Sequence, residues 1–316
     1  MNERIGIIGA GVVGTAVGVV LHSKGFEVTG IYDVKPESTM ALVERIGCAA
    51  FPTPQEVSRS ADILFITTSD SCIQAVADEL AERQAFHEGQ VVLHMSGAHS
   101  SEILDKAKRF EARVLSVHPL QSFASLDQAI ENLPGSVFSI EGDVGAQDQA
   151  VVIVKALGGE HFFIDRKSKP LYHAGACVVS NYLVTIVGLG VKLLEATGIS
   201  GAVAIKALMP LITGTVNNIQ SIGVPQALTG PVARGDLSTV QKHQECMEEQ
   251  APQLLSLYSS LGYYTADVAR DKGTIDPARQ EAFHQMFASK IGSAVKNAPG
   301  SSLTVSRDGN TVSEGE

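Results

Sequence analysis

The chain has 316 residues, of which 44% are hydrophobic and 18% charged, and its formal net charge at pH 7 is -10. This length exceeds the usual size of one compact core, so we expect two domains. The acidic balance argues against nucleic acid as a partner, because nucleic-acid binding needs clustered Lys and Arg. The four cysteines form no C-x-x-C pair. Their spacing therefore excludes a disulfide framework and a zinc knuckle, and it predicts a reducing, cytoplasmic setting.

One apolar stretch, residues 176–194, is about long enough to span a bilayer. It carries polar side chains at Ser180, Asn181 and Thr185, which a membrane interior disfavours. We therefore predict a buried helix and no membrane segment. The N-terminus lacks the layout of a signal peptide, which again favours the cytoplasm.

Short apolar runs alternate with amphipathic stretches over the first half of the chain. This alternation predicts strand–helix units that form a Rossmann-type, doubly wound parallel sheet. The strands expected in chain order are 4–9, 27–33, 61–67, 90–95, 113–117, 137–141 and 161–165. The predicted fold class is thus α/β, with a dinucleotide-binding domain at residues 1–166.

The second half of the chain changes to helical spacing of its apolar residues. Helices are expected at 169–196, 201–221, 236–261 and 276–293. We predict an all-α domain at residues 167–296 that contributes to substrate binding and dimerisation. Residues 297–316 have few apolar side chains, and we expect them to form a disordered tail.

A glycine fingerprint follows the first expected strand, in the sequence IGIIGAGVVG. Gly9 permits a tight turn, Gly11 lets the backbone approach a pyrophosphate, and Gly14 allows the helix to pack closely on the strand. The N–H groups at the start of this helix suit phosphate oxygens. The loop predicted to hold the cofactor comprises Gly9, Ala10, Gly11, Val12, Val13 and Gly14.

Polar residues at two further strand ends complete the predicted cofactor site. Asp33 ends the second strand, where a carboxylate can bind a ribose diol and favour NAD. Lys35 is two residues on and can instead neutralise the 2′-phosphate of NADP, so the choice between NAD and NADP stays open. Thr67, Thr68 and Ser69 end the next strand at the ligand-binding edge. Their alternative role is to cap the helix that follows.

Two histidines are the candidates for proton transfer, because the pKa of histidine lies near neutrality. His118 ends a predicted strand directly before Pro119, and Ser96 ends the preceding strand. Ser96 can bind the substrate or the nicotinamide carboxamide, or it can simply hold a serine turn. His173 and Asn181 share one helix face by three-and-four spacing. If buried, each needs a polar partner or a ligand. No metal site is predicted.

Five motifs in this order resemble those of uncharacterised bacterial oxidoreductases that join a Rossmann-like domain to a helical domain of unknown function. The motifs are Gly9-Ala10-Gly11, His94-Met95-Ser96-Gly97, the HPLQSF segment from His118 to Phe123, Tyr172-His173 with Asn181-Tyr182, and the TGP and RGD segments from Thr229 to Asp236. The resemblance covers nearly all of residues 3–293. It implies an NAD(P)-binding fold of the 6-phosphogluconate dehydrogenase-like group and a homodimer formed through the helical domain.

The same group includes pyrroline-5-carboxylate reductases and deazaflavin-dependent NADP oxidoreductases. Ser96 and His118 are also similar to a strand-end serine and an H-P-M histidine of prephenate dehydrogenases, although Leu120 replaces the methionine here. The lysine that hydroxyacid dehydrogenases of the group carry on their first long helix is expected to be absent. His173 and Asn181 occupy that region, which favours a histidine-based proton transfer.

The sequence therefore predicts an NAD(P)-dependent oxidoreductase that transfers hydride between the cofactor and a small carbonyl or imine substrate, or the corresponding alcohol or amine. The alternative is a non-catalytic dinucleotide sensor on the same fold. A third, weaker interpretation makes the cofactor a reduced deazaflavin. The expected partners are a small-molecule substrate and a second copy of the chain, with no nucleic acid and no membrane.

Overall fold

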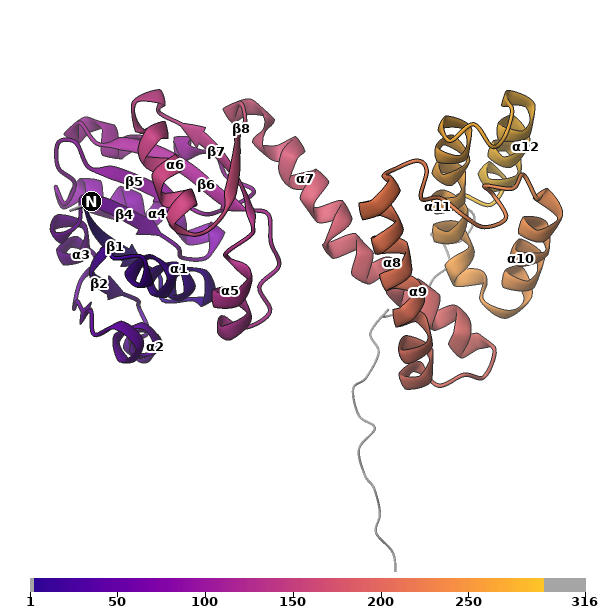
Figure 1. Ribbon diagram of the computed structural model, residues 1–316, viewed down its shortest axis with the longest axis horizontal. Helices are drawn as coiled ribbons and strands as arrows, with labels where there is room; N and C mark the ends of the chain where they lie inside the picture. Colours follow the sequence, from indigo (N-terminus) through magenta and orange to yellow (C-terminus); the bar gives the residue numbers. More distant parts are fainter. Residues whose placement is uncertain (1–2, 293–316) are drawn as a thin grey trace, which may run out of the picture. The chain divides into compact units, whose positions relative to one another are not determined.

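The computed structural model describes residues 3–292 (Figure 1). The chain divides into two compact units, the first running to Ser180 and the second starting at Asn181. The first unit is longer than the domain expected at residues 1–166 because it includes one further helix. The tail expected at residues 297–316 lies outside the described residues.

The first unit is built on a sheet of eight strands in the order β3-β2-β1-β4-β5-β6-β7-β8. The strands are β1 Arg4–Ile8, β2 Glu27–Tyr32, β3 Ala49–Ala50, β4 Ile63–Ile66, β5 Val91–His94, β6 Arg113–Pro119, β7 Val137–Gly142 and β8 Glu160–Phe163. The sequence did not predict the two-residue β3, which is too short for a periodic signal. The mostly parallel sheet confirms the Rossmann-type fold.

The sheet departs from the parallel arrangement at one place, where β7 pairs with β6 in the antiparallel direction. The connection between them contains only the seven-residue α5, Leu126–Asn132. β7 starts at the edge of the sheet where β6 ends, with Phe138 beside Pro119, and runs back along β6.

Helices cover the sheet and enclose two hydrophobic clusters. The helices of the first unit are α1 Val12–Ser23, α2 Pro36–Ile46, α3 Pro54–Ser60, α4 Asp70–Glu82, α5, α6 Gln147–Ala156 and α7 Lys169–Val179, with 3-10 helices at Ser101–Phe110 (η1), Val144–Ala146 (η2) and Arg166–Ser168 (η3). Ile7 belongs to one cluster and its neighbour Ile8 to the other. Successive residues of a strand face opposite sides, so both faces of the sheet are buried.

The described part of the second unit is helical. Its helices are α8 Asn181–Ala196, α9 Gly201–Ile222, α10 Leu237–Gln250, α11 Pro252–Asp271 and α12 Pro277–Ala288. The helix expected at 169–196 is two elements, α7 and α8, separated at Ser180. The helix expected at 236–261 is also two, because Pro252 cannot donate a backbone hydrogen bond and starts α11.

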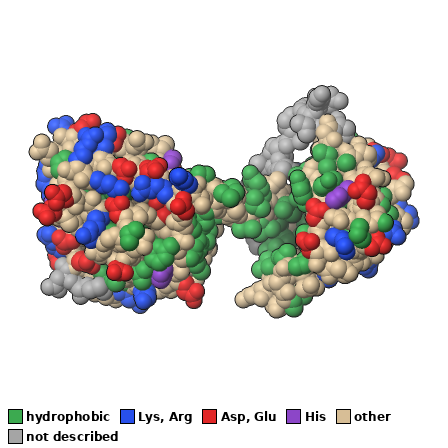
Figure 2. Space-filling model, turned by 90° about the horizontal axis from the view of Figure 1, so that it is seen from above, with side chains coloured by type: hydrophobic (Ala, Val, Ile, Leu, Met, Phe, Trp, Pro, Cys, Tyr) green, Lys and Arg blue, Asp and Glu red, His purple; other side chains and the backbone are tan. Residues whose placement is uncertain are grey.

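The apolar helices α8 and α9 are largely exposed. Val184 on α8 is 73% exposed and Leu211 on α9 is 67% exposed. Hydrophobic side chains, green in Figure 2, gather on the surface of this helical region. The prediction that residues 176–194 form a buried helix is therefore wrong for the single chain. By length and composition alone, two described helical stretches, Arg166–Ala196 and Gly201–Ile222, are long enough and apolar enough to cross a membrane.

Candidate functional site

The glycine loop joins β1 to α1 in a conformation that only glycine tolerates well. Gly9 has a φ of +106°, and a side chain there would meet the backbone of Thr67 and Thr68. A side chain at Gly14 would meet the carbonyl oxygen of Gly9 and the hydroxyl of Thr67. The Thr67 hydroxyl itself donates to the Gly9 carbonyl at 2.8 Å. Thr67, expected to bind the cofactor, thus braces the loop that would bind it.

Gly11 differs from the other two glycines because no atom would meet a side chain there. It opens α1 next to a cavity of about 390 Å³. Gly9, Asp33, Thr68 and Ser69 also line this cavity. The opening at Gly11 and the exposed start of α1 fit a dinucleotide phosphate in this cavity. Ala10, Val12 and Val13 complete the loop: Ala10 is buried, and the two valines are half-buried.

Asp33 forms hydrogen bonds with the backbone of the glycine loop and with that of the segment after β2. One of its carboxylate oxygens accepts from the Ala10 N–H at 2.8 Å and the other from the Lys35 N–H at 2.9 Å. Asp33 thereby fixes the glycine loop against the end of β2. The Lys35 side chain is exposed and is not among the residues that line the cavity.

Ser96 holds a turn after β5, as the alternative interpretation of this residue stated. Its hydroxyl accepts the N–H groups of Ala98 and His99, each at 3.2 Å. The buried His94 imidazole accepts the Ser96 N–H at 3.1 Å, so its other ring nitrogen donates to the Ser100 carbonyl. Burial lowers the pKa of His94 to about 3. His94 and Ser96 therefore shape the loop that follows β5.

The structure brings His118 and His173 together beside this loop. The His118 Nδ1 atom lies 2.7 Å from the Tyr172 hydroxyl, and the rings of His118 and His173 are 6.3 Å apart. A side chain at Gly97 would lie 2.7 Å from the His118 Nε2 atom and 2.6 Å from the His173 ring. Gly97 therefore lets the loop approach both histidines.

Lys169 joins the same cluster, although the sequence did not predict it as a site residue. It is the first residue of α7 and is fully buried. Its ammonium donates to the Ser116 hydroxyl at 2.6 Å and lies 5.6 Å from the centre of the Tyr172 ring. Ser116 is two residues before His118 on β6. In the sequence, Lys169 follows Arg166 and Lys167 and resembles one more surface cation, so nothing marked it as buried.

The buried setting determines which of these groups carries a proton at neutral pH. Burial, followed by the charges of Lys169 and His173, lowers the pKa of His118 to about 3. The His118 imidazole is therefore neutral near pH 7. Burial also lowers the pKa of Lys169 to about 8, opposed by the carboxylates of Glu141 and Asp70. Lys169 thus keeps its proton at neutral pH but loses it closer to neutrality than an ordinary lysine does.

Asn181 is the predicted site residue that the first unit does not contain. It starts α8 in the second unit and is exposed. In the single chain Asn181 is therefore not one of the buried residues that would need a polar partner. His173 is half-buried, with the Cys177 sulfur 3.7 Å from its Nε2 atom.

Comparisons with known protein families match two separate stretches of the chain. Residues 2–119 match a Rossmann-like domain, and residues 136–265 match a domain of unknown function (DUF2520). The chain therefore joins a Rossmann-like domain to this domain of unknown function, as the sequence motifs predicted. None of the curated proteins matches the sequence.

Several solved structures share the fold. A protein from Thermotoga maritima is 26% identical, with a TM-score of 0.66, over 85% of this chain and 99% of that chain. An imine reductase from a Pseudomonas species is 18% identical, with a TM-score of 0.57, over 91% and 93%. The pyrroline carboxylate reductase of Plasmodium falciparum, with NADP bound, is 13% identical, with a TM-score of 0.53, over 90% and 98%. The chain thus shares its fold with NAD(P)-dependent reductases.

Proposed function

We propose that this protein is an NAD(P)-dependent reductase or dehydrogenase that acts on a small carbonyl or imine compound. The observation that carries the proposal is that one unit contains both a glycine-loop cavity and a partly buried cluster of His118, His173, Tyr172 and Lys169. Groups with strongly shifted pKa values beside a cavity are typical of catalytic sites. The fold shared with imine and pyrroline carboxylate reductases supports the same class.

The glycine loop and its neighbours are the residues that would hold the cofactor. The backbone at Gly11 and the start of α1 would receive the pyrophosphate, and Asp33, Thr68 and Ser69 line the remaining cavity. When bound, the nicotinamide supplies or accepts the hydride. Thr67 acts indirectly, because its hydroxyl holds the Gly9 carbonyl.

His118 and Lys169 divide the proton chemistry between them. The neutral His118 imidazole orients a substrate oxygen or nitrogen by a hydrogen bond, and Tyr172 fixes the ring at its Nδ1 atom. The Lys169 ammonium, whose pKa is about 8, supplies the positive charge and the proton at neutral pH. Reduction would therefore slow as the pH rises through about 8 and Lys169 loses its proton.

The exposed apolar surface of α8 and α9 supports a second proposal, that the protein is a homodimer through its helical unit. The two helices pack against each other, and α9 contains one charged side chain, Lys206, among 22 residues. Asn217, Asn218 and Gln220 interrupt the apolar sequence of α9. Such polar side chains are costly in a bilayer, so a second copy explains this surface better than a membrane.

The test of the enzymatic proposal begins with calorimetric titration by NADH and NADPH, followed by a screen of carbonyl and imine compounds with the cofactor that binds. We expect His118→Ala to abolish turnover while the affinity for the cofactor stays within a few fold, because the residue lies outside the cofactor cavity. The control is His22→Ala, which removes an exposed histidine of α1. Failure of both cofactors to bind would refute the proposal. Cofactor binding without turnover of any compound would favour the dinucleotide sensor.

A further inference from the structure

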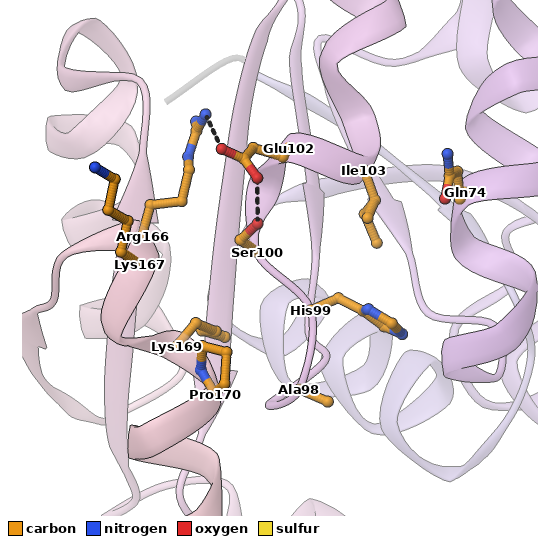
Figure 3. A pocket seen from close by; sticks show the side chains of 10 residues that line it. All are labelled: Gln74, Ala98, His99, Ser100, Glu102, Ile103, Arg166, Lys167, Lys169 and Pro170. Carbon is orange, nitrogen blue, oxygen red and sulfur yellow. Dashed lines mark hydrogen bonds and ion pairs between the residues drawn. The ribbon is translucent and has the colours of Figure 1, made fainter.

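A second cavity of about 480 Å³ lies within the first unit, next to the histidine cluster (Figure 3). Its walls come from the loop after β5, from α4, and from the segment where η3 continues into α7. Three cations line it, Arg166, Lys167 and Lys169, against one carboxylate, Glu102. The cavity wall therefore carries an excess of positive charge.

Arg166 is held in place by a buried carboxylate behind the cavity. Glu141 is 2% exposed and accepts both the N–H and the hydroxyl of Ser101. The Arg166 guanidinium donates to the same Ser101 hydroxyl at 2.8 Å, with its Nε atom 3.5 Å from Glu141. Glu102 is 3.6 Å from the guanidinium on the cavity side. These two carboxylates fix the guanidinium at the cavity wall, and with Glu141 counted the three cations still exceed the carboxylates by one charge.

Lys169 is a buried ammonium with donor capacity to spare. Among the described residues, its recorded hydrogen bond is the one to Ser116, which uses one of its three N–H donors. Glu141 and Asp70 act on its charge without a recorded hydrogen bond. A buried ammonium with unfilled donors is costly, and an anionic oxygen in the cavity would offset that cost.

Lys167 supplies a second cation at the exposed side of the cavity. Its backbone N–H donates to Asp165, but among the described residues its ammonium has no recorded ion pair. The adjoining α7 starts without a side-chain cap, so its partial positive charge adds to that of the lysine. The cavity thus combines one fixed guanidinium, one buried ammonium and one exposed ammonium.

We propose that this cavity binds a carboxylate or phosphate group of the substrate and so makes the protein specific for anionic substrates. The inference rests on the proposed function, because it places the anionic group relative to the reacting atoms. Lys169 lines the cavity and is also bonded to Ser116, on the strand that carries His118. An anion held by Arg166 and Lys167 would thus leave the remainder of the substrate beside the histidines.

Direct binding of two probes, inorganic phosphate and acetate, tests the site without any turnover. The 31P line width of phosphate and the 13C line width of acetate are measured with the full chain at constant ionic strength. We expect at least one probe to bind. Lys167→Glu should lower the affinity for that probe about tenfold, because it reverses a charge at the cavity. The matched control is Lys24→Glu, which makes the same change at the end of α1.

Two binding results would overturn the inference. One is that neither probe broadens in the presence of the wild-type protein. The other is that Lys167→Glu and Lys24→Glu weaken probe binding equally. The probes would then respond to the net charge of the protein and not to this cavity. If phosphate binds and acetate does not, the group is a phosphate, and the reverse result indicates a carboxylate. Both variants replace exposed side chains, so both should fold.

Turnover separates this inference from the proposed function. For any compound that is reduced, we expect the free acid to have a higher kcat/KM than its methyl ester, with Lys167→Glu removing the difference. If the acid and the ester are reduced with equal kcat/KM, the inference of an anion site is overturned, whereas the proposed reductase function is retained. If the protein binds phosphate or acetate at this cavity but binds no cofactor, the proposed reductase function is refuted and the proposed anion site is retained.

Discussion

The Rossmann-like unit buries its apolar residues, whereas the first helices of the second unit expose theirs. All four residues of β4 are buried, but Ala204 is the single buried residue of the 22-residue α9. Both segments are rich in apolar residues, so an apolar composition alone does not predict burial. The difference lies in what covers each segment: helices of the first unit enclose β4, whereas among the described residues of the second unit α9 packs against α8 and its outer face stays exposed.

This difference separates what the chain completes alone from what we expect a second copy to complete. The first unit contains the glycine loop, the histidine cluster and both cavities within its own residues. Cofactor binding should therefore survive loss of the dimer. In contrast, we expect the exposed apolar side chains of α8 and α9 to be buried only in the dimer.

The largest effect is expected from Gly11→Val in the first unit. The new side chain meets no atom of the protein, so the melting temperature should stay near that of wild type. It would occupy the position proposed for the pyrophosphate, and cofactor affinity should fall about 100-fold or more. Calorimetric titration measures the affinity, and thermal denaturation checks the fold.

The matched control for this change is Gly214→Val on α9, where a side chain also meets no atom. It should leave cofactor affinity unchanged. If Gly11→Val retained the affinity, the phosphate position proposed here would be wrong.

The next effect concerns the exposed helices, where Leu211→Glu places a charge on α9. In a single chain this change is harmless, because Leu211 is 67% exposed. In a dimer it would bury an unpaired carboxylate, which costs several kcal/mol and should release monomers. Light scattering after size-exclusion chromatography measures the mass of the particle in solution.

The control for the helical surface is Val144→Glu in the first unit, where Val144 is 80% exposed. It should leave the mass unchanged. A wild-type protein that is already monomeric would refute the dimer, and extraction only by detergent would favour a membrane instead.

Acid should destabilise the first unit before the second. His94 and His118 have folded-state pKa values of about 3, against 6.5 for an ordinary histidine. Between pH 6.5 and 3 the unfolded chain binds protons that the folded unit does not, so stability is lost as the pH falls. Each histidine lowers the free energy of unfolding by about 1.4 kcal/mol per pH unit in this window. Amide hydrogen exchange, followed separately in each unit, shows which unit loses stability first as the pH falls.

His94→Gln tests the cause of this acid sensitivity, because it removes one titrating group. The amide of glutamine keeps a donor for the Ser100 carbonyl and an acceptor for the Ser96 N–H. The variant should lose less stability than wild type between pH 6.5 and 4. An identical pH dependence in the two proteins would show that His94 is not responsible.

The sequence predicted the first unit better than the site inside it. Glycine spacing and buried strands are local signals, so the loop at Gly9, Gly11 and Gly14 and seven of the eight strands could be found. The place of Lys169 in the histidine cluster could not be predicted, because the burial of Lys169 depends on α7 packing beside Ser116, which is on a strand distant in the sequence. The surroundings of Asn181 could not be predicted either. Helical spacing places Asn181 on a face with His173 but does not show which residues cover that face.

The smallest effect concerns the choice between NAD and NADP, which the sequence left open between Asp33 and Lys35. In the structure, Asp33 and Glu79 line the glycine-loop cavity, and among the described residues no Lys or Arg does. The 2′-phosphate of NADP would therefore meet negative charge without a cation to balance it. We expect NADH to bind about tenfold more tightly than NADPH, by a like-charge cost of roughly 1.4 kcal/mol.

Competition calorimetry with the two reduced cofactors measures this ratio in wild type, Glu79→Gln and Lys35→Ala. Glu79→Gln removes one of the two negative charges from the cavity and should narrow the ratio. Lys35→Ala should leave the ratio unchanged, because the Lys35 side chain is exposed outside the cavity lining. If wild type prefers NADPH and Lys35→Ala abolishes that preference, Lys35 reaches the 2′-phosphate when the cofactor binds. The end of β2 would then change conformation on binding.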